Sequence, residues 1–134
     1  MSPRPAVRVK RVYDPPDPTD GVRILVDRLW PRGVRKEDLA HDAWLKDVAP
    51  SGDLRTWYGH RPERFERFAR RYREELGSGA AADALGQLRE SVRSRTVTLL
   101  TATRDVERSG AAVLAEVLAE GGRRGGRGAR NVRE

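Results

Sequence analysis

The stretch TVTLLTATRD, residues 96–105, decides the fold predicted for this chain. Its first six residues are β-branched or apolar, which predicts a strand, and polarity then returns abruptly at Thr103, Arg104 and Asp105. A helix is predicted to follow and to end at Gly121. Its inward-facing residues are Val113, Leu114, Val117 and Leu118. A strand that runs into a polar turn and then a helix is typical of an α/β domain.

Two helices are predicted ahead of this strand. The first begins at Pro62, which suits an opening helical position, and ends before Gly77. Its apolar residues fall on one stripe at helical spacing: Phe65, Phe68, Ala69, Tyr72 and Leu76. The opposite side is charged, which indicates a solvated face. The second helix is predicted over residues 80–92.

Two more strands are predicted near the amino terminus. Residues 7–12 alternate valine with basic residues, which is typical of a half-exposed edge strand. Residues 23–27 are nearly continuous in apolar character, as in a strand covered on both faces. These two strands form either a hairpin or neighbours in one sheet. Short helices are expected between residues 33 and 60, with Ser51 as a helix cap.

The order of these elements predicts a single three-layer, Rossmann-like α/β domain. Its small sheet is expected to be at least partly parallel and flanked by helices, because a long helical crossover separates the strands. We assign residues 1–120 to this domain. Residues 121–134, GGRRGGRGARNVRE, are predicted to be a disordered Gly/Arg-rich tail.

Composition narrows the functional classes. The chain has no cysteine, which excludes disulfides and thiolate chemistry, and it lacks the run of about 20 apolar residues that a membrane span needs. We therefore expect a soluble, cytoplasmic protein. The tail holds five arginines and one glutamate, so it contributes +4 of the formal net charge of +7. A tail of this kind resembles short RNA-binding segments but has no aromatic residue for base stacking, so the case for nucleic acid is weak.

Charged residues gather after two predicted strands, where α/β sheets bind ligands. Asp27, Arg28 and Arg32 follow one strand and Arg104 follows the other, so the two groups converge if these strands are parallel neighbours. Arginines placed together need an anion, either a phosphate or carboxylate of a ligand or a carboxylate of the protein. The sequence leaves open whether they bind a ligand or form a structural ion network with Asp27.

Further site residues are predicted from residue type alone. Asp27, Lys46 and His60 are the candidates for proton transfer, and Asp27 can alternatively orient the arginines. Trp30 or Trp57 would supply an apolar wall beside a small anionic ligand. No histidine or carboxylate set has a recognised metal spacing, and no phosphate loop or nucleophile motif occurs, so no metal or cofactor is expected.

Three segments resemble the YeaO-like family, the bacterial domain of unknown function 488. They are RVYDPPDPTDGVRILVDRLWPRGVRKEDL (11–39), AWLKDVAPSGDLRTWYGHRPERFERFARRYREEL (43–76) and VTLLTATRD (97–105). The resemblance covers about residues 8–120 and implies a small cytoplasmic α/β domain whose reaction is not established. The family's motifs fall on Asp27, Arg28, Trp30, Pro31, Arg32, Gly33, Trp44, Lys46, Pro50, Ser51, Leu54, Arg55, Trp57 and His60.

The chain departs from that family pattern after the last predicted strand. Relatives tend to carry a His/Asn-containing run where this chain has residues 107–110, ERSG, and distant relatives place a cysteine where this chain has Thr101 or Thr103. A shared catalytic mechanism therefore does not follow from the resemblance.

Three functions remain open from the sequence. The first is an enzyme or binding protein for a small anionic ligand at the strand ends. The second is an accessory protein that binds nucleic acid through its basic surface and tail. The third is a structural or interaction module without catalysis, in which tryptophans form a dimer seam. The sequence does not decide whether the protein is an enzyme, nor its oligomeric state.

Overall fold

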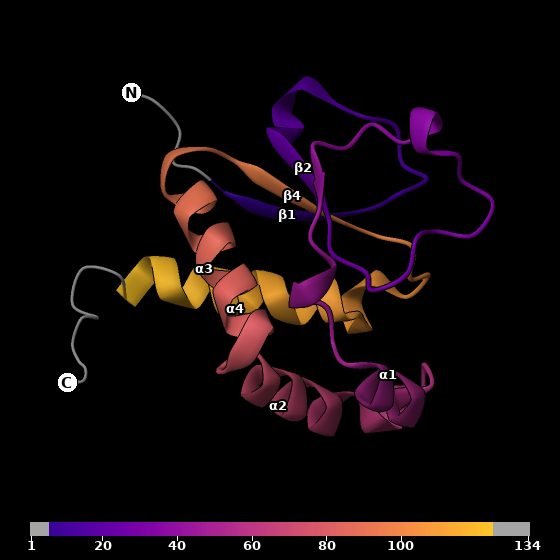
Figure 1. The fold of residues 1–134 in the computed structure, drawn as a ribbon, viewed down its shortest axis with the longest axis vertical. Coiled ribbons are helices and arrows are strands. Elements are labelled where there is room, and N and C mark those ends of the chain that lie inside the picture. The colour runs from indigo at the N-terminus through magenta and orange to yellow at the C-terminus, as the bar shows by residue number, and fades with distance from the viewer. Residues whose placement is uncertain (1–5, 125–134) are drawn as a thin grey trace.

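The computed structural model describes residues 6–124 and contains one sheet of four strands in the order β1-β4-β2-β3. Figure 1 shows β4 between β1 and β2. The strands are β1 (Val7–Arg11), β2 (Val22–Leu25), β3 (Ala43–Trp44) and β4 (Val97–Thr101). Every pairing is parallel. The predicted α/β class is confirmed, and the sheet is parallel throughout.

The position of β4 corrects one expectation for the first two strands. β1 and β2 both pair with β4, one on each side, and both run parallel to it. Because they point in the same direction, β1 and β2 cannot form a hairpin, and they lie in one sheet without being neighbours. Their proline-rich connection has to return the chain from the carboxyl end of β1 to the opposite edge of the sheet, where β2 begins. A tight turn cannot span that distance.

Four α-helices accompany the sheet: α1 (Gly52–Tyr58), α2 (Phe65–Glu75), α3 (Gly79–Ser94) and α4 (Gly110–Arg124). The predicted cap of α1 is confirmed, because the Ser51 side chain accepts a hydrogen bond from the backbone N–H of Leu54 at 3.1 Å. α4 continues to Arg124 instead of ending at Gly121. Glycine lowers helix stability without forbidding the conformation.

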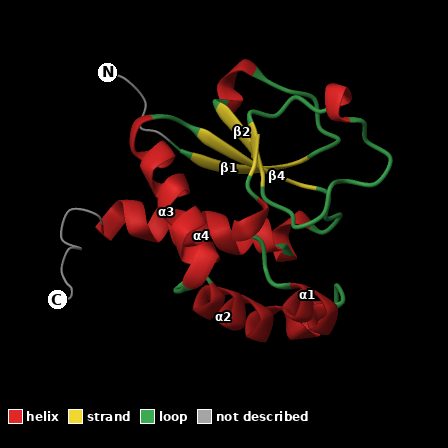
Figure 2. Cartoon of the chain, viewed as in Figure 1, coloured by secondary structure: helices red, strands yellow, loops and turns green. Residues whose placement is uncertain are grey.

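The helices and the loops pack on opposite faces of the sheet (Figure 2). The larger core joins helical side chains such as Phe68 and Leu114 to Val97 and Leu99 of β4. The second core contains Leu25 and Leu100, which point the other way along their strands. It is covered by Val12, Leu39 and the flanking Trp30, Val34, Trp44 and Ala102, none of which lies in an α-helix. One outer layer is therefore helical and the other consists of loops with short 3-10 turns.

Both faces of β4 are covered, so all five of its residues are buried. This explains the uninterrupted apolar and β-branched run that predicted the strand. Most of the predicted tail, residues 125–134, lies outside the described residues, so the proposed boundary of the domain stays a prediction. No helix within the described part of the chain is long and apolar enough to cross a membrane.

Candidate functional site

A cleft of about 850 Å³ opens at the carboxyl ends of β2 and β4. The register pairs Leu25 with Leu100, so both strands end at the same edge of the sheet. The segments that leave this edge line the cleft, together with α1 and the first residues of α4. The polar and charged lining residues are Arg11, Asp27, Arg28, Arg32, Arg55, Thr56, His60, Thr103, Arg104, Asp105 and Ser109. The two clusters that follow the predicted strands therefore meet in one place.

Asp27 connects the ends of β2 and β4. Its carboxylate accepts hydrogen bonds from the Thr101 hydroxyl at 2.7 Å and from the backbone N–H of Ala102 at 2.8 Å. The indole of Trp44 donates to the Asp27 carbonyl at 2.7 Å. Burial raises the pKa of Asp27, and the two hydrogen bonds and the charge of Arg55 offset it only in part. No lysine or arginine of the described residues lies within 4.0 Å of this carboxylate.

Arg28 binds backbone carbonyls instead of Asp27. Its side chain donates to the carbonyl of Pro50 at 3.0 Å and to that of Ala49 at 3.1 Å. These contacts attach the segment before α1 to the end of β2. Arg28 therefore lines the cleft and at the same time holds one of its walls in place.

Three other arginines of the cleft, Arg32, Arg55 and Arg104, are exposed. Among the described residues, no carboxylate lies within ion-pair distance of any of them. Asp105 already pairs with Arg108 at 3.0 Å. Five arginines and two aspartates line the cleft in all, so its charge is strongly positive.

The first turn of α4 also lines the cleft and contributes backbone N–H groups to it. Ser109 accepts a hydrogen bond from the N–H of Ala112 at 3.1 Å, which leaves the N–H groups of Gly110 and Ala111 without an acceptor in the described structure. Gly110 also lies against Pro50, where a Cβ atom would sit 3.1 Å from the proline Cγ. The cleft wall and the helix start are therefore closely packed.

His60 occupies the cleft with an unusual backbone conformation. Its φ of 57° is the one positive value found for a residue other than glycine in the described chain, and Gly59 before it has φ of 55°. A side chain in this left-handed region costs roughly 1 kcal/mol. The ring centre lies 6.4 Å from that of Tyr58.

Two predicted site residues lie outside the cleft lining. The Lys46 ammonium sits 5.2 Å from the ring centre of Trp44. The Trp57 ring lies beside two guanidinium groups, with its centre 5.1 Å from Cζ of Arg64 and 5.0 Å from Cζ of Arg71. The structure thus brings together Asp27, His60, Arg28, Trp30, Arg32 and Arg104, and it places Lys46 and Trp57 elsewhere.

The tryptophans pack within the chain. Trp30 lines the cleft, but its indole donates to the Val34 carbonyl and its ring packs edge-on against Trp44 with centres 5.4 Å apart. Trp30, Trp44 and Trp57 are all half-buried. Trp30 and Trp44 pack on the loop-side core, whereas Trp57 packs on the helical core.

Sequence reasoning did not select Arg55 or Tyr13 as site residues. Arg55 stands in the LRTWYGH motif and Tyr13 in RVYDPP, so both lay inside segments that resembled the family. Nothing in the sequence showed which side of α1 would face the sheet edge. Motif membership was the available signal.

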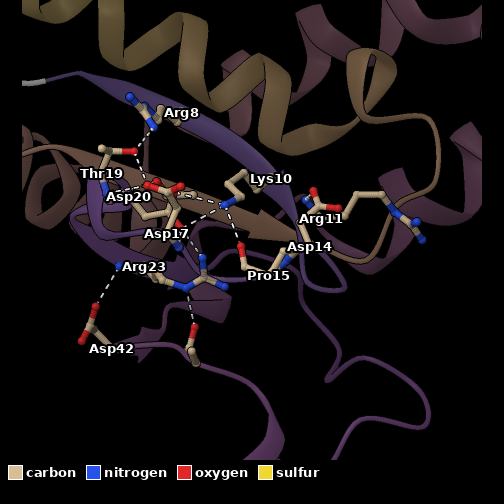
Figure 3. Close-up of polar contacts among 12 residues, drawn as sticks. Arg8, Lys10, Arg11, Asp14, Pro15, Asp17, Thr19, Asp20, Arg23 and Asp42 are labelled. Carbon is tan, nitrogen blue, oxygen red and sulfur yellow. Dashed lines mark hydrogen bonds and ion pairs between the residues drawn. The ribbon is translucent and has the colours of Figure 1, made fainter.

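A separate ion network lies on the loop-covered face, beside the start of β2 (Figure 3). The buried carboxylate of Asp20 accepts hydrogen bonds from Lys10 at 3.1 Å, from the N–H of Asp17 at 3.0 Å and from Arg23. Arg23 is also buried and donates to the carbonyl of Ala40. Burial acts to raise the pKa of Asp20, but these hydrogen bonds outweigh it and the pKa is lowered. This buried ion network does not include Asp27.

Comparison with known proteins gives a consistent family. Residues 6–131 match the family described as the inactive DUF488-N3 subclade. Uncharacterized proteins of Mycobacterium tuberculosis strain H37Rv and Mycobacterium bovis are each 57% identical over 112 residues, which is 84% of this chain and 92% of theirs. The uncharacterized protein YeaO of Escherichia coli K12 is 38% identical over 84% of this chain and 96% of its own length. No solved structure matches the chain significantly.

Proposed function

Since the chain belongs to the DUF488 family, within its inactive DUF488-N3 subclade, we propose that it binds a small anionic ligand in the cleft and does not transform it chemically. One observation carries the proposal. Arg32, Arg55 and Arg104 line the same cleft, and the described structure contains no carboxylate that pairs with them.

The electrostatics favour an anion over a neutral ligand. Guanidinium groups that share a cleft repel one another, and an anion that enters relieves this repulsion while it gains charge-assisted hydrogen bonds. The free N–H groups at the start of α4 point to the same preference, because the amino end of a helix attracts negative charge. Both effects act at the carboxyl edge of the sheet, where α/β proteins bind ligands.

The arrangement gives less support to catalysis. Both carboxylate oxygens of Asp27 already accept hydrogen bonds from the protein, and Lys46 lies outside the cleft lining. Of the three predicted proton-transfer residues, His60 alone keeps an exposed side chain in the cleft. A binding role agrees with the family's description as inactive.

Titration with inorganic phosphate at low ionic strength tests the proposal. We expect phosphate to raise the melting temperature of the protein, and the double variant Arg32→Gln/Arg104→Gln to lose most of this shift. Arg93→Gln is the matched control, because Arg93 is an exposed arginine on α3 away from the cleft. The proposal is wrong if neither phosphate nor carboxylates shift the melting temperature, or if the double variant responds as the control does.

A further inference from the structure

We propose that the ligand is a nucleoside monophosphate, whose phosphate binds among the cleft arginines while its base stacks on Tyr13. This inference rests on the proposed function, because it names the class of anion that the same cleft takes. It draws on three features that the anion proposal does not use: the size of the cleft, its exposed apolar side chains and its neutral hydrogen-bonding groups.

The cleft is larger than a bare anion requires. Its volume of about 850 Å³ falls in the range of roughly 300–1,000 Å³ that is usual for pockets that hold a whole small organic molecule. A phosphate or acetate ion alone would leave most of this space to water. The ligand should therefore carry a sizeable neutral part beside its charge.

The apolar side chains at the cleft indicate what that part is. Tyr13 is 52% exposed and Leu29 is 60% exposed, and these are the exposed large hydrophobic residues of the described chain. Both line this one cleft. The Arg11 guanidinium lies 4.7 Å from the centre of the Tyr13 ring and restrains it from one side. An exposed, restrained aromatic ring beside a positive cleft is suited to stack a planar base.

The charged part fits a phosphate ester better than a carboxylate. A carboxylate fills a single guanidinium fork, whereas a phosphate monoester has two negative charges and three oxygens that can engage several forks at once. Arg32, Arg55 and Arg104 supply three such forks in the same cleft.

Neutral polar groups are available for the sugar. The hydroxyls of Thr56 and Thr103 line the cleft and can each donate and accept a hydrogen bond. A ribose presents hydroxyls of the same kind, so these side chains would complete the contacts between the phosphate and the base.

Calorimetric titration of the full chain with adenosine monophosphate, ribose 5-phosphate and inorganic phosphate tests the inference. We expect adenosine monophosphate to bind about tenfold more tightly than ribose 5-phosphate, since stacking of one base typically contributes such a factor. Tyr13→Ala should reduce the affinity for adenosine monophosphate to that for ribose 5-phosphate and leave phosphate binding unchanged. Tyr13→Phe keeps the ring and should retain the preference.

The outcomes separate this inference from the proposed function. If phosphate binds but adenosine monophosphate binds no better than ribose 5-phosphate, the cleft is an anion site and the nucleotide class is wrong. A preference for adenosine monophosphate that survives Tyr13→Ala would overturn the stacking on Tyr13. Absence of binding by all three compounds would overturn the nucleotide class. The anion proposal would then fail as well if carboxylates also leave the melting temperature unchanged.

Discussion

Asp20 and Asp27 flank the same strand, β2, and their carboxylates have opposite surroundings. Asp20 is buried beside two cations, Lys10 and Arg23, and its pKa is lowered. Asp27 accepts hydrogen bonds from neutral donors only, and burial raises its pKa. Within the described residues, the cations at the start of β2 are therefore paired with a buried carboxylate, whereas arginines near its end have no carboxylate partner.

This difference indicates that the charged residues at the two ends of β2 have different roles. A buried ion network that is satisfied within the protein holds loops to the sheet, and removal of one member exposes the others to an apolar environment. Exposed arginines without carboxylate partners contribute little to folding. Substitutions at the two ends of β2 should therefore differ sharply in their effect on stability, and the following predictions test that contrast.

Asp20→Asn should have the largest effect. It removes the negative charge that compensates buried Arg23, and breaking a buried ion pair in this way typically lowers the free energy of unfolding by about 3–5 kcal/mol. Urea denaturation measures the loss. Asp38→Asn is the control, because Asp38 pairs with Arg35 at the surface and its replacement should cost less than about 1 kcal/mol. Equal losses in the two variants would show that the network at β2 is not stabilising.

The two aspartates should also respond to pH in opposite directions. The raised pKa of Asp27 means that the folded protein holds this proton more tightly than the unfolded chain does. The resulting stability is complete below the ordinary pKa of 3.8 and is lost as pH rises through the folded-state value. The stability from Asp20, whose pKa is lowered, is present above 3.8 and is lost as pH falls through its folded-state value.

Denaturation of the wild type, Asp27→Asn and Asp20→Asn from acid to neutral pH checks these signs. The stability of the wild type relative to Asp27→Asn should decrease as pH rises. Relative to Asp20→Asn it should increase. A parallel change in both comparisons would contradict the different environments of the two carboxylates.

The contrast also shows what the sequence could predict. The run of apolar and β-branched residues at 97–101 and the helical stripe from Phe65 to Leu76 predicted their elements, because burial imposes those patterns directly. The convergence of Asp27 and Arg104 on one cleft was predicted only on the condition that their strands are parallel neighbours, and the pairing of β2 with β4 meets that condition. The elements themselves needed local pattern alone.

The partners of each aspartate needed the strand order, which local pattern does not contain. Lys10, Asp20 and Arg23 meet because β4 lies between β1 and β2, and sequence reasoning expected those two strands to be neighbours or a hairpin. Asp27 was expected to pair with an arginine if it formed a structural network. It instead bonds to Thr101 and Ala102, because the end of β4 lies directly beside it.

Gly110→Ala should have an intermediate effect at the cleft. The new Cβ atom would lie 3.1 Å from Pro50 Cγ, and such overpacking typically costs about 1–3 kcal/mol of stability. Gly86→Ala is the matched control, since Gly86 lies within α3 and has open space around it, so alanine should stabilise by about 0.5–1 kcal/mol. Denaturation of both variants measures the difference. If Gly110→Ala were as favourable as the control, the cleft wall would be loosely packed, unlike the core beneath it.

Arg104→Met should have the smallest effect on the free energy of unfolding. It tests most directly the contrast between the two ends of β2. Arg104 is exposed and has no carboxylate partner among the described residues, so the change should alter the free energy of unfolding by less than about 0.5 kcal/mol. Arg23→Met, the same substitution at the other end of β2, should cost several times more because Asp20 would lose one of its two cations. Denaturation measures both. A loss above about 1 kcal/mol for Arg104→Met would show that this cleft arginine stabilises the fold. A negligible loss would agree with a role in anion binding, which the phosphate titration tests directly.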